Sequence, residues 1–165
     1  MITRDHFKAS RTRSPRRVAR SWANSALTLG RSAIESEHAA YEKRGEMTPR
    51  ESILLRVLAD WVALDRIHWD VSESKPGAPL IAIQDATLTL IHDLVEEGLF
   101  EVGEVSDERG FSPWTEPLDE AVERIRSVYV DGFDKQNIWP WYCWLNLTDK
   151  GEQLAQRIQS TPSTS

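Results

Sequence analysis

Cysteine and long apolar stretches are scarce in this chain of 165 residues. Cys143 is the only cysteine, so a disulfide within the chain is excluded and a reducing cytoplasm is the compartment we expect. No apolar run approaches the roughly 20 residues that span a bilayer, and no apolar signal-peptide segment follows the basic N-terminus. We therefore expect no membrane partner. The remaining composition, 40% hydrophobic and 28% charged, is typical of a globular domain.

Motifs that carry catalytic or cofactor chemistry are also missing. The sequence contains no glycine-rich phosphate loop, no nucleophile elbow and no Ser-His-Asp arrangement. Its histidines and Cys143 lack the spacing of metal ligands. His92 and Asp93 are adjacent on a predicted helix, where neighbouring side chains diverge, so we do not expect a dyad. The sequence predicts a protein that is not an enzyme and has no metal or other cofactor.

Charge is distributed unevenly along the chain, whose net charge is −6. Residues 1–31 hold eight Lys or Arg against a single Asp5, a net charge of +7, whereas residues 32–165 hold 12 basic and 25 acidic residues, a net charge of −13. A basic segment of this kind binds nucleic acid, another anionic surface or the chain's own acidic body. The arginines that would contact phosphates are Arg11, Arg13, Arg16, Arg17 and Arg20.

The pattern divides the chain into four segments. Residues 1–17 are predicted to be a disordered basic tail, and residues 18–46 an N-terminal helical arm in which apolar residues recur three or four positions apart. Residues 47–159 form the folded domain, and residues 160–165 a disordered tail. A translation start at Met47 would leave that domain whole, and N-terminal sequencing of the native protein would test it.

The domain opens on a strong helix-start signal. Thr48 can accept a hydrogen bond from the N–H of Glu51, the Glu51 side chain can reach back, and Pro49 suits the first helical position. The apolar spacing that follows fits one long helix over 49–72. It fits equally a helix, a short strand and a second helix capped by Asp65, and periodicity does not separate the two interpretations.

The centre of the domain is predicted to be a helix that runs directly into a strand. Residues 72–83 contain two prolines and are predicted to form a loop. Asp85 then caps a helix, which Gly98 ends in the left-handed conformation. Phe100 and Val102 alternate with polar or small residues, which is typical of a half-buried strand.

A second strand returns and leads into the last helix. Residues 106–137 are predicted to form an insert that holds a polar turn and a helix capped by Thr115. Residues 138–147 are strand-like, with Pro140 at an edge or bulge, and Thr148 caps the final helix. The predicted fold is therefore α+β and mostly α, with a two- or three-stranded sheet and a helical insert.

This order of elements resembles the winged-helix superfamily, and its MarR-like and PadR-like branches in particular. The likeness covers roughly residues 48–158, and the motifs that carry it are LLRVLADW, LIHDLVEEGLFEVGE and WLNLTDKGEQLA. It implies a third helix that enters the DNA major groove and offers basic or amide side chains to bases and phosphates. The long helical insert between the two strands departs from the family pattern.

The predicted third helix carries the wrong charge for this role. It contains no Lys or Arg, and its acidic residues include Asp93, Glu96 and Glu97, with Gln84 and Thr87 expected to point outward near its start. DNA affinity depends largely on neutralising phosphates. Ordinary DNA binding through this helix is therefore not expected.

Seven tryptophans are many for a chain of this length. Three lie on amphipathic elements and are predicted to be core residues: Trp61, Trp69 and Trp144. Three others lie in or near the insert, where they either pack it onto the sheet or anchor a partner: Trp114, Trp139 and Trp141.

The sequence thus favours a non-enzymatic domain that binds an unknown protein partner. Its expected contact residues are Trp114, Trp139, Trp141, Asp93, Glu96 and Glu97, of which the carboxylates would attract a basic surface. The alternative is a DNA-binding transcriptional regulator that uses the basic N-terminal arm. That alternative also predicts a homodimer, because such regulators bind paired half-sites.

Overall fold

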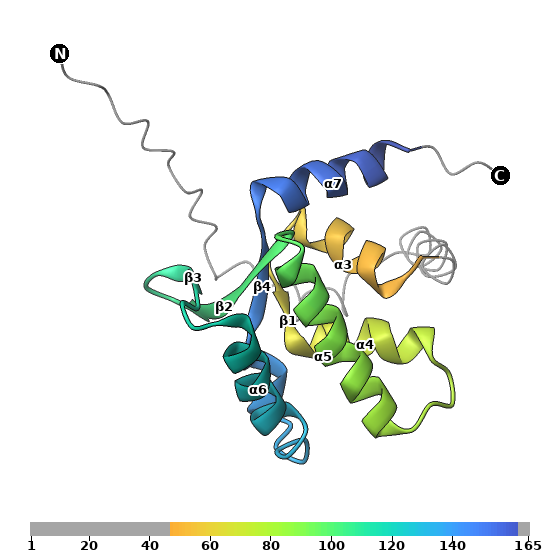
Figure 1. Cartoon of the computed structure of the whole chain (residues 1–165), viewed down its shortest axis with the longest axis vertical. Helices are drawn as coiled ribbons and strands as arrows, with labels where there is room; N and C mark the ends of the chain where they lie inside the picture. The colour runs from red at the N-terminus through yellow and green to blue at the C-terminus, as the bar shows by residue number, and fades with distance from the viewer. Residues whose placement is uncertain (1–46, 162–165) are drawn as a thin grey trace, which may run out of the picture.

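The computed structural model describes residues 47–161, which form a four-stranded antiparallel sheet with five α-helices around it (Figure 1). The elements in chain order are α3 (Pro49–Val57), β1 (Val62–Ala63), α4 (Leu64–Ser74), α5 (Leu80–Glu96), β2 (Phe100–Ser106), β3 (Gly110–Pro113), α6 (Leu118–Tyr129), the 3-10 helix η1 (Trp139–Trp141), β4 (Trp144–Leu147) and α7 (Asp149–Ser160). The predicted α+β, mostly helical class is confirmed. The predicted tail over 1–17, the arm over 18–46 and the end of the chain from residue 162 lie outside the described residues.

Helix α3 begins at the predicted signal. The Glu51 N–H donates to Thr48 Oγ1 at 3.3 Å, and the Thr48 N–H donates to Glu51 Oε2 at 3.0 Å, which completes a capping box. The helix ends at Val57, and β1 separates it from α4, so the two-helix interpretation is correct. The N-cap of α4 is Ala63 and not Asp65, because pairing with β4 keeps the backbone extended up to that residue.

Helix α5 is longer than the sequence predicts. It begins at Leu80, so the predicted cap at Asp85 is wrong, and the predicted loop over 72–83 is confined to residues 75–79 between α4 and α5. The added turn is held by a tertiary contact, because the Gln84 amide donates to the Tyr129 carbonyl at 3.3 Å. Local composition, which here includes two prolines, could not reveal a partner so distant along the chain.

The turn from α5 into the sheet follows the prediction. Gly98 has φ of +71°, the left-handed conformation that glycine adopts without steric cost, and Leu99 then leads into β2. Phe100 and Val102 are buried and Glu101 is exposed, as the alternation indicates.

The sheet has four strands in the order β1-β4-β2-β3, so the predicted two or three strands were too few. Strand β2 pairs with β4 over Phe100–Gly103 and with β3 over Gly103–Ser106. The strand that the sequence missed is β3, four residues at the sheet edge. Strand β3 pairs with β2 through backbone groups, so its sequence shows no apolar alternation. Its glycine and proline are more typical of a turn, and the segment was therefore predicted to be one.

Two further boundaries differ from the sequence prediction. The predicted strand over 138–147 is a strand only from Trp144, because Trp139–Trp141 form η1, and the Trp139 indole N–H holds this turn by donating to the Phe133 carbonyl at 3.1 Å. Helix α6 begins at Leu118 after Pro117, whose backbone is extended, and Thr115 makes no capping bond.

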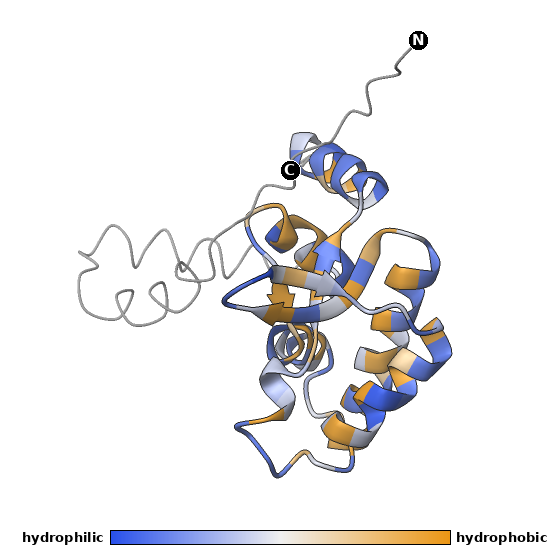
Figure 2. Cartoon of the chain, turned by 90° about the vertical axis from the view of Figure 1, so that its left-hand side faces the viewer, coloured by the Kyte–Doolittle hydropathy of each residue, from blue (hydrophilic) through white to orange (hydrophobic). Residues whose placement is uncertain are grey.

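One continuous core joins the sheet to the helices. Its largest fully buried side chains include Ile53, Leu54, Leu64, Ile67, Leu88, Ile91, Leu94, Phe100, Ile125 and Leu145. Hydrophobic residues alternate with hydrophilic ones along most helices and strands, whereas α7 is mostly hydrophilic (Figure 2). Among residues 47–161, no helix combines the length and apolar character that a membrane crossing requires.

The predicted core tryptophans are less buried than expected. Trp69 is 53% exposed, so its assignment to the core is wrong, and Trp61 and Trp144 are only half-buried. The buried face of α4 carries Ile67 and Val71. Residues two positions apart in a helix are separated by about 200° of rotation, so Trp69 lies on the opposite side of α4 from Ile67.

Candidate binding surfaces

Helix α6, in the predicted insert, lies beside α5 and antiparallel to it (Figure 1). Near the start of α5, Arg126 Nη1 lies 3.4 Å from Asp85 Oδ1. Near its end, His92 Nε2 lies 3.5 Å from Asp119 Oδ1. These contacts advance along α5 as they retreat along α6, so the insert flanks the predicted third helix along much of its length.

This packing corrects the expectation that Gln84 and Thr87 point outward. Both are buried, with exposed fractions of 3% and 0%. The Thr87 hydroxyl donates to the Ile83 carbonyl at 2.8 Å within the helix, and the Gln84 amide donates to the Tyr129 carbonyl at 3.3 Å. The polar side chains that would have been offered to a DNA groove are therefore engaged inside the protein.

A line of five carboxylates follows the contact between α5 and α6. We call it the acidic seam, and its members are Asp85, Asp93, Glu96, Asp119 and Glu123. The side chains of Asp93, Glu96 and Asp119 are 51%, 69% and 94% exposed. Arg126 lies 3.4 Å from Asp85 and 3.8 Å from Glu123, and Arg50, which is hydrogen-bonded to Glu97, also attracts Asp93. The seam is therefore strongly negative and open to solvent.

His92 stands at the centre of the seam. Its Nδ1 lies 3.4 Å from Asp93 Oδ1 and 3.9 Å from Glu96 Oε2, so the expectation that the His92 and Asp93 side chains diverge is wrong. Rotation of their side-chain bonds brings the two together despite adjacent backbone positions. Ligand atoms of His92, Asp93 and Glu96 lie within 4.8 Å of one another, and these are the described residues that could hold a metal ion. The sequence spacing did not indicate this group.

Glu97, although it follows the seam residues, is engaged elsewhere. Arg50 donates to both of its carboxylate oxygens, at 2.7 and 2.5 Å, and the Lys150 ammonium donates to its backbone carbonyl at 2.6 Å. The hydrogen bonds from Arg50 hold the pKa of Glu97 below its usual value. Its charge is thus compensated within the protein.

The three tryptophans predicted as anchors lie in different environments. Trp141 is 46% exposed and stacks on Trp144 with ring centroids 6.0 Å apart. Trp114 is half-buried beneath the Arg124 guanidinium, which lies 3.9 Å from its ring centroid. Trp139 is only 3% exposed. The structure therefore does not bring these three side chains together into one exposed patch.

A second feature is a hollow between α4 and the segment that follows α6. Its volume is about 410 Å³. Helix α4 contributes Asp65, Arg66, His68 and Trp69, and the later segment contributes Phe133, Gln136 and Trp139. We call it the aromatic hollow. The sequence did not predict it, because its two walls are distant along the chain and neither carries a recognisable motif.

The inner wall of the aromatic hollow is a rigid cluster of rings. Phe133 and Trp139 stack with centroids 4.9 Å apart, and both lie within 5.5 Å of the His68 ring. His68 Nδ1 lies 2.5 Å from the buried Tyr129 hydroxyl. Burial lowers the pKa of His68 and raises that of Tyr129 to about 12, so both groups are neutral near pH 7 and are joined by this hydrogen bond. Burial also raises the pKa of Asp65.

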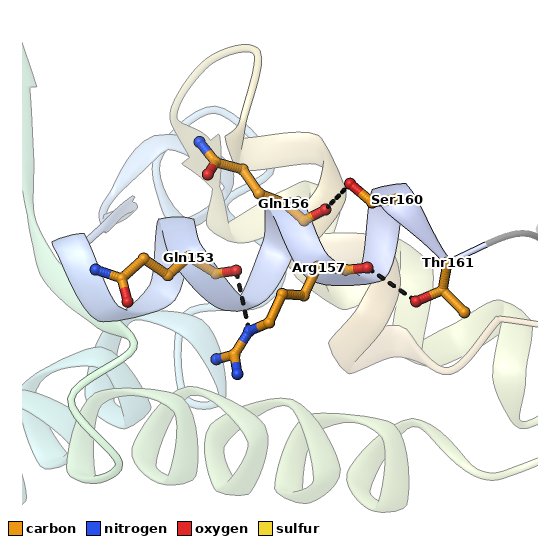
Figure 3. A pocket seen from close by; sticks show the side chains of 5 residues that line it. All are labelled: Gln153, Gln156, Arg157, Ser160 and Thr161. Atoms are coloured by element: carbon orange, nitrogen blue, oxygen red, sulfur yellow. Dashed lines mark hydrogen bonds between the residues drawn. The ribbon is translucent and has the colours of Figure 1, made fainter.

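The polar shelf along α7 is a weaker candidate (Figure 3). Its lining residues are Gln153, Gln156, Arg157, Ser160 and Thr161, and all of them come from the end of one helix. Arg157, Ser160 and Thr161 donate to carbonyl groups of α7 itself, four residues earlier in each case. Their hydrogen-bonding capacity is therefore partly used within the helix.

The basic residues predicted for nucleic-acid binding, Arg11, Arg13, Arg16, Arg17 and Arg20, lie outside the described residues. Comparisons with protein families, curated proteins and solved structures gave no match to this chain. The function must therefore be inferred from the chemistry of the surfaces themselves.

Proposed function

We propose that residues 48–158 form a winged-helix-like domain that binds a basic protein through the acidic seam. The element order supports the winged-helix comparison, since a helix, a short strand and two helices precede β2, and β4 lies between β1 and β2. The departure is the insert, which supplies both β3 and α6. On this proposal, α5 occupies the position of the DNA-binding third helix of winged-helix proteins but contacts a protein and not DNA.

The antiparallel packing of α6 on α5 carries the proposal. It places Asp119 and Glu123 beside a helix that already exposes Asp93 and Glu96. Among the described residues, Arg126 contacts Asp85 and Glu123, and Arg50, which binds Glu97, also attracts Asp93, so carboxylates outnumber the cations along this contact. A duplex brought to this side would place phosphates against carboxylates. Lysine and arginine side chains would instead gain complementary charge, which speeds association and disfavours wrong partners.

Two other features agree with a protein partner in the cytoplasm. Trp141 reaches the surface, and exposed aromatic side chains often anchor protein interfaces. Cys143 is buried and free, and burial raises its pKa to about 12, so it behaves as a small apolar side chain and not as a reactive thiol.

A charge-reversal experiment tests the proposal. The full chain and its Asp93→Lys/Glu96→Lys variant are immobilised, incubated with extract of the source cell, and the retained proteins are identified by mass spectrometry. The matched control is Glu101→Lys/Glu104→Lys, which reverses two exposed charges on β2. We expect the wild type and the control to retain the same basic protein and the seam variant to lose it.

Duplex DNA provides the opposing outcome. We expect no sequence-specific shift of DNA by the full chain. Tight, salt-dependent binding that disappears when Arg11, Arg13, Arg16, Arg17 and Arg20 become Gln would instead establish the DNA-binding alternative and contradict the proposal.

A further inference from the structure

The aromatic hollow has the composition of a site for an organic cation. Trp69 lies at the edge of the hollow with 53% of its surface exposed, because the opposite face of α4 makes the contacts with the core. Phe133 and Trp139 form a stacked inner wall with centroids 4.9 Å apart. Aromatic faces carry negative electrostatic potential and attract ammonium and guanidinium groups within about 6 Å of the ring centroid.

Asp65 adds a carboxylate to this lining. It lies in the first turn of α4, and burial raises its pKa even though the Arg66 N–H donates to it and the Arg66 guanidinium attracts it. Its negative charge is therefore poorly solvated. A cation that entered the hollow would replace the lost hydration, while a neutral or anionic guest would not.

The hollow is large enough to receive a lysine or arginine side chain. About 410 Å³ is near the lower end of the range for small-molecule pockets, and a lysine or arginine side chain fills only part of it. The hollow also adjoins the end of α6, because Tyr129 in the last turn of that helix is hydrogen-bonded to His68, and Phe133, which lines the hollow, follows four residues later. A partner that lies along α6 can reach both features.

We infer that the aromatic hollow receives a lysine or arginine side chain of the basic partner, held between Trp69 and Asp65. This inference rests on the proposed function, since it names where one cationic residue of that partner is bound. The seam then provides long-range attraction, and the hollow provides a desolvated anchor of the kind that dominates interface energetics.

A substitution at Arg66 can distinguish a cationic guest from an anionic one. It lines the hollow and is a cation, so it opposes a cationic guest and would favour an anionic one. Replacing Arg66 by Gln should leave the binding of a cation unchanged or strengthen it. If the guest were a carboxylate, the same change would weaken binding.

The experiment uses capped amino acids as probes and the full chain as receptor. N-acetyl-lysine N-methylamide, its trimethylated form and the arginine analogue are titrated at millimolar concentrations, with the norleucine and glutamate analogues as neutral and anionic controls. Binding is followed by NMR shifts of the tryptophan indole N–H signals. The Trp69 signal is identified by its loss in Trp69→Phe. We expect the cationic probes to shift that signal and the two control probes to leave it in place.

Variants locate the site. Trp69→Ala and Asp65→Asn should each weaken the binding of the lysine probe by about three- to tenfold, and Trp69→Phe should retain most of the affinity. In the two Trp69 variants, binding is followed at the indole N–H signal of Trp139, which also lines the hollow. Ile81→Ala is the matched control, since it removes another large exposed apolar side chain outside the hollow, and should change nothing. Circular dichroism spectra and thermal unfolding confirm that each variant remains folded.

Equal binding of the norleucine probe, binding of the glutamate probe that depends on Arg66, or no binding of any cation would each overturn the inference. These outcomes are separable from failure of the proposed function. If Asp93→Lys/Glu96→Lys loses a basic partner while the lysine probe never binds, only the inference fails. If the probe binds at Trp69 but no basic protein depends on the seam, the proposed function fails.

Discussion

Arg50 at the start of α3 binds Glu97 at the end of α5 through two parallel hydrogen bonds, with Nη1 at 2.7 Å from Oε1 and Nη2 at 2.5 Å from Oε2. Guanidinium and carboxylate groups match in this geometry, which makes bidentate pairs stronger than single contacts. The pair therefore links the first turn of α3 to the C-terminal end of α5. It also removes Glu97 from the negative charge that a partner would meet.

Acid should abolish the stabilisation from this pair. Arg50 lowers the pKa of Glu97, so its contribution to stability is complete above the ordinary value of 4.5 and is lost as the pH falls through the lower value of the folded state. We expect Arg50→Met to be less stable than the wild type at neutral pH and equally stable in strong acid, as measured by urea unfolding across this range. Arg109→Met is the exposed control. A difference that did not vary with pH would show that Arg50 acts through packing alone.

The loss of stability in alkali should depend on Tyr129. Burial raises its pKa from 10.0 to about 12, so its contribution to stability is complete below pH 10 and is lost as the pH rises through 12. Tyr129→Phe also removes the hydroxyl that is hydrogen-bonded to His68 Nδ1. We expect a loss on the order of 1 kcal/mol at neutral pH and a smaller decline between pH 10 and 12 than in the wild type, both measured by chemical unfolding. An unchanged alkaline decline would mean that Tyr129 does not ionise in this range upon unfolding.

Two of the three threonines that were predicted to cap helices, Thr48 and Thr115, should differ in their effect on stability. Thr48 accepts the Glu51 N–H and completes the capping box, whereas Thr115 is exposed and makes no cap. We expect Thr48→Ala to lower the free energy of unfolding by about 1 kcal/mol. Thr115→Ala should stay within about 0.5 kcal/mol of the wild type in the same urea titration. Equal effects of the two changes would contradict the assigned boundary of α6.

Gly151 should not tolerate a side chain. It is buried in the first turn of α7, where a Cβ atom would overlap the Leu99 carbonyl oxygen and lie 2.8 Å from Leu147 Cδ2. Alanine ordinarily favours a helix over glycine, yet here we expect Gly151→Ala to destabilise the fold by about 2 kcal/mol, because α7 must move away from the sheet. Gln153→Ala, on the exposed face of the same helix, is the control for thermal unfolding. Stabilisation by Gly151→Ala would show that α7 is not packed this closely.

Local chemistry explains which elements the sequence predicted well. The Thr48 capping box, the left-handed Gly98 and the Thr148 cap of α7 each depend on residues within three or four positions of one another. The half-buried alternation at the start of β2 depends on the pleat of a single strand. Such features can be predicted because their partners are neighbours in the chain.

The candidate surfaces depend on contacts that no local pattern encodes. Asp93 and Glu96 were predicted from the sequence as contact residues. Asp119 joins them around His92 only because α6 packs antiparallel on α5. Trp69 was assigned to the core, since an apolar side chain at helical spacing usually lies there. The aromatic hollow exists because Phe133 and Trp139 fold back onto α4.

The sequence by itself determined the α+β class, the acidic character of the body and the absence of basic residues from the third helix. These follow from composition and short-range periodicity, which any arrangement of the elements preserves. Tertiary structure alone decided how the charge of each carboxylate is balanced, since Arg50 donates to Glu97 from 47 residues away, whereas α6 brings Asp119 and Glu123 beside α5. Charge acts through space, so its balance at a surface is fixed only when distant segments have packed together.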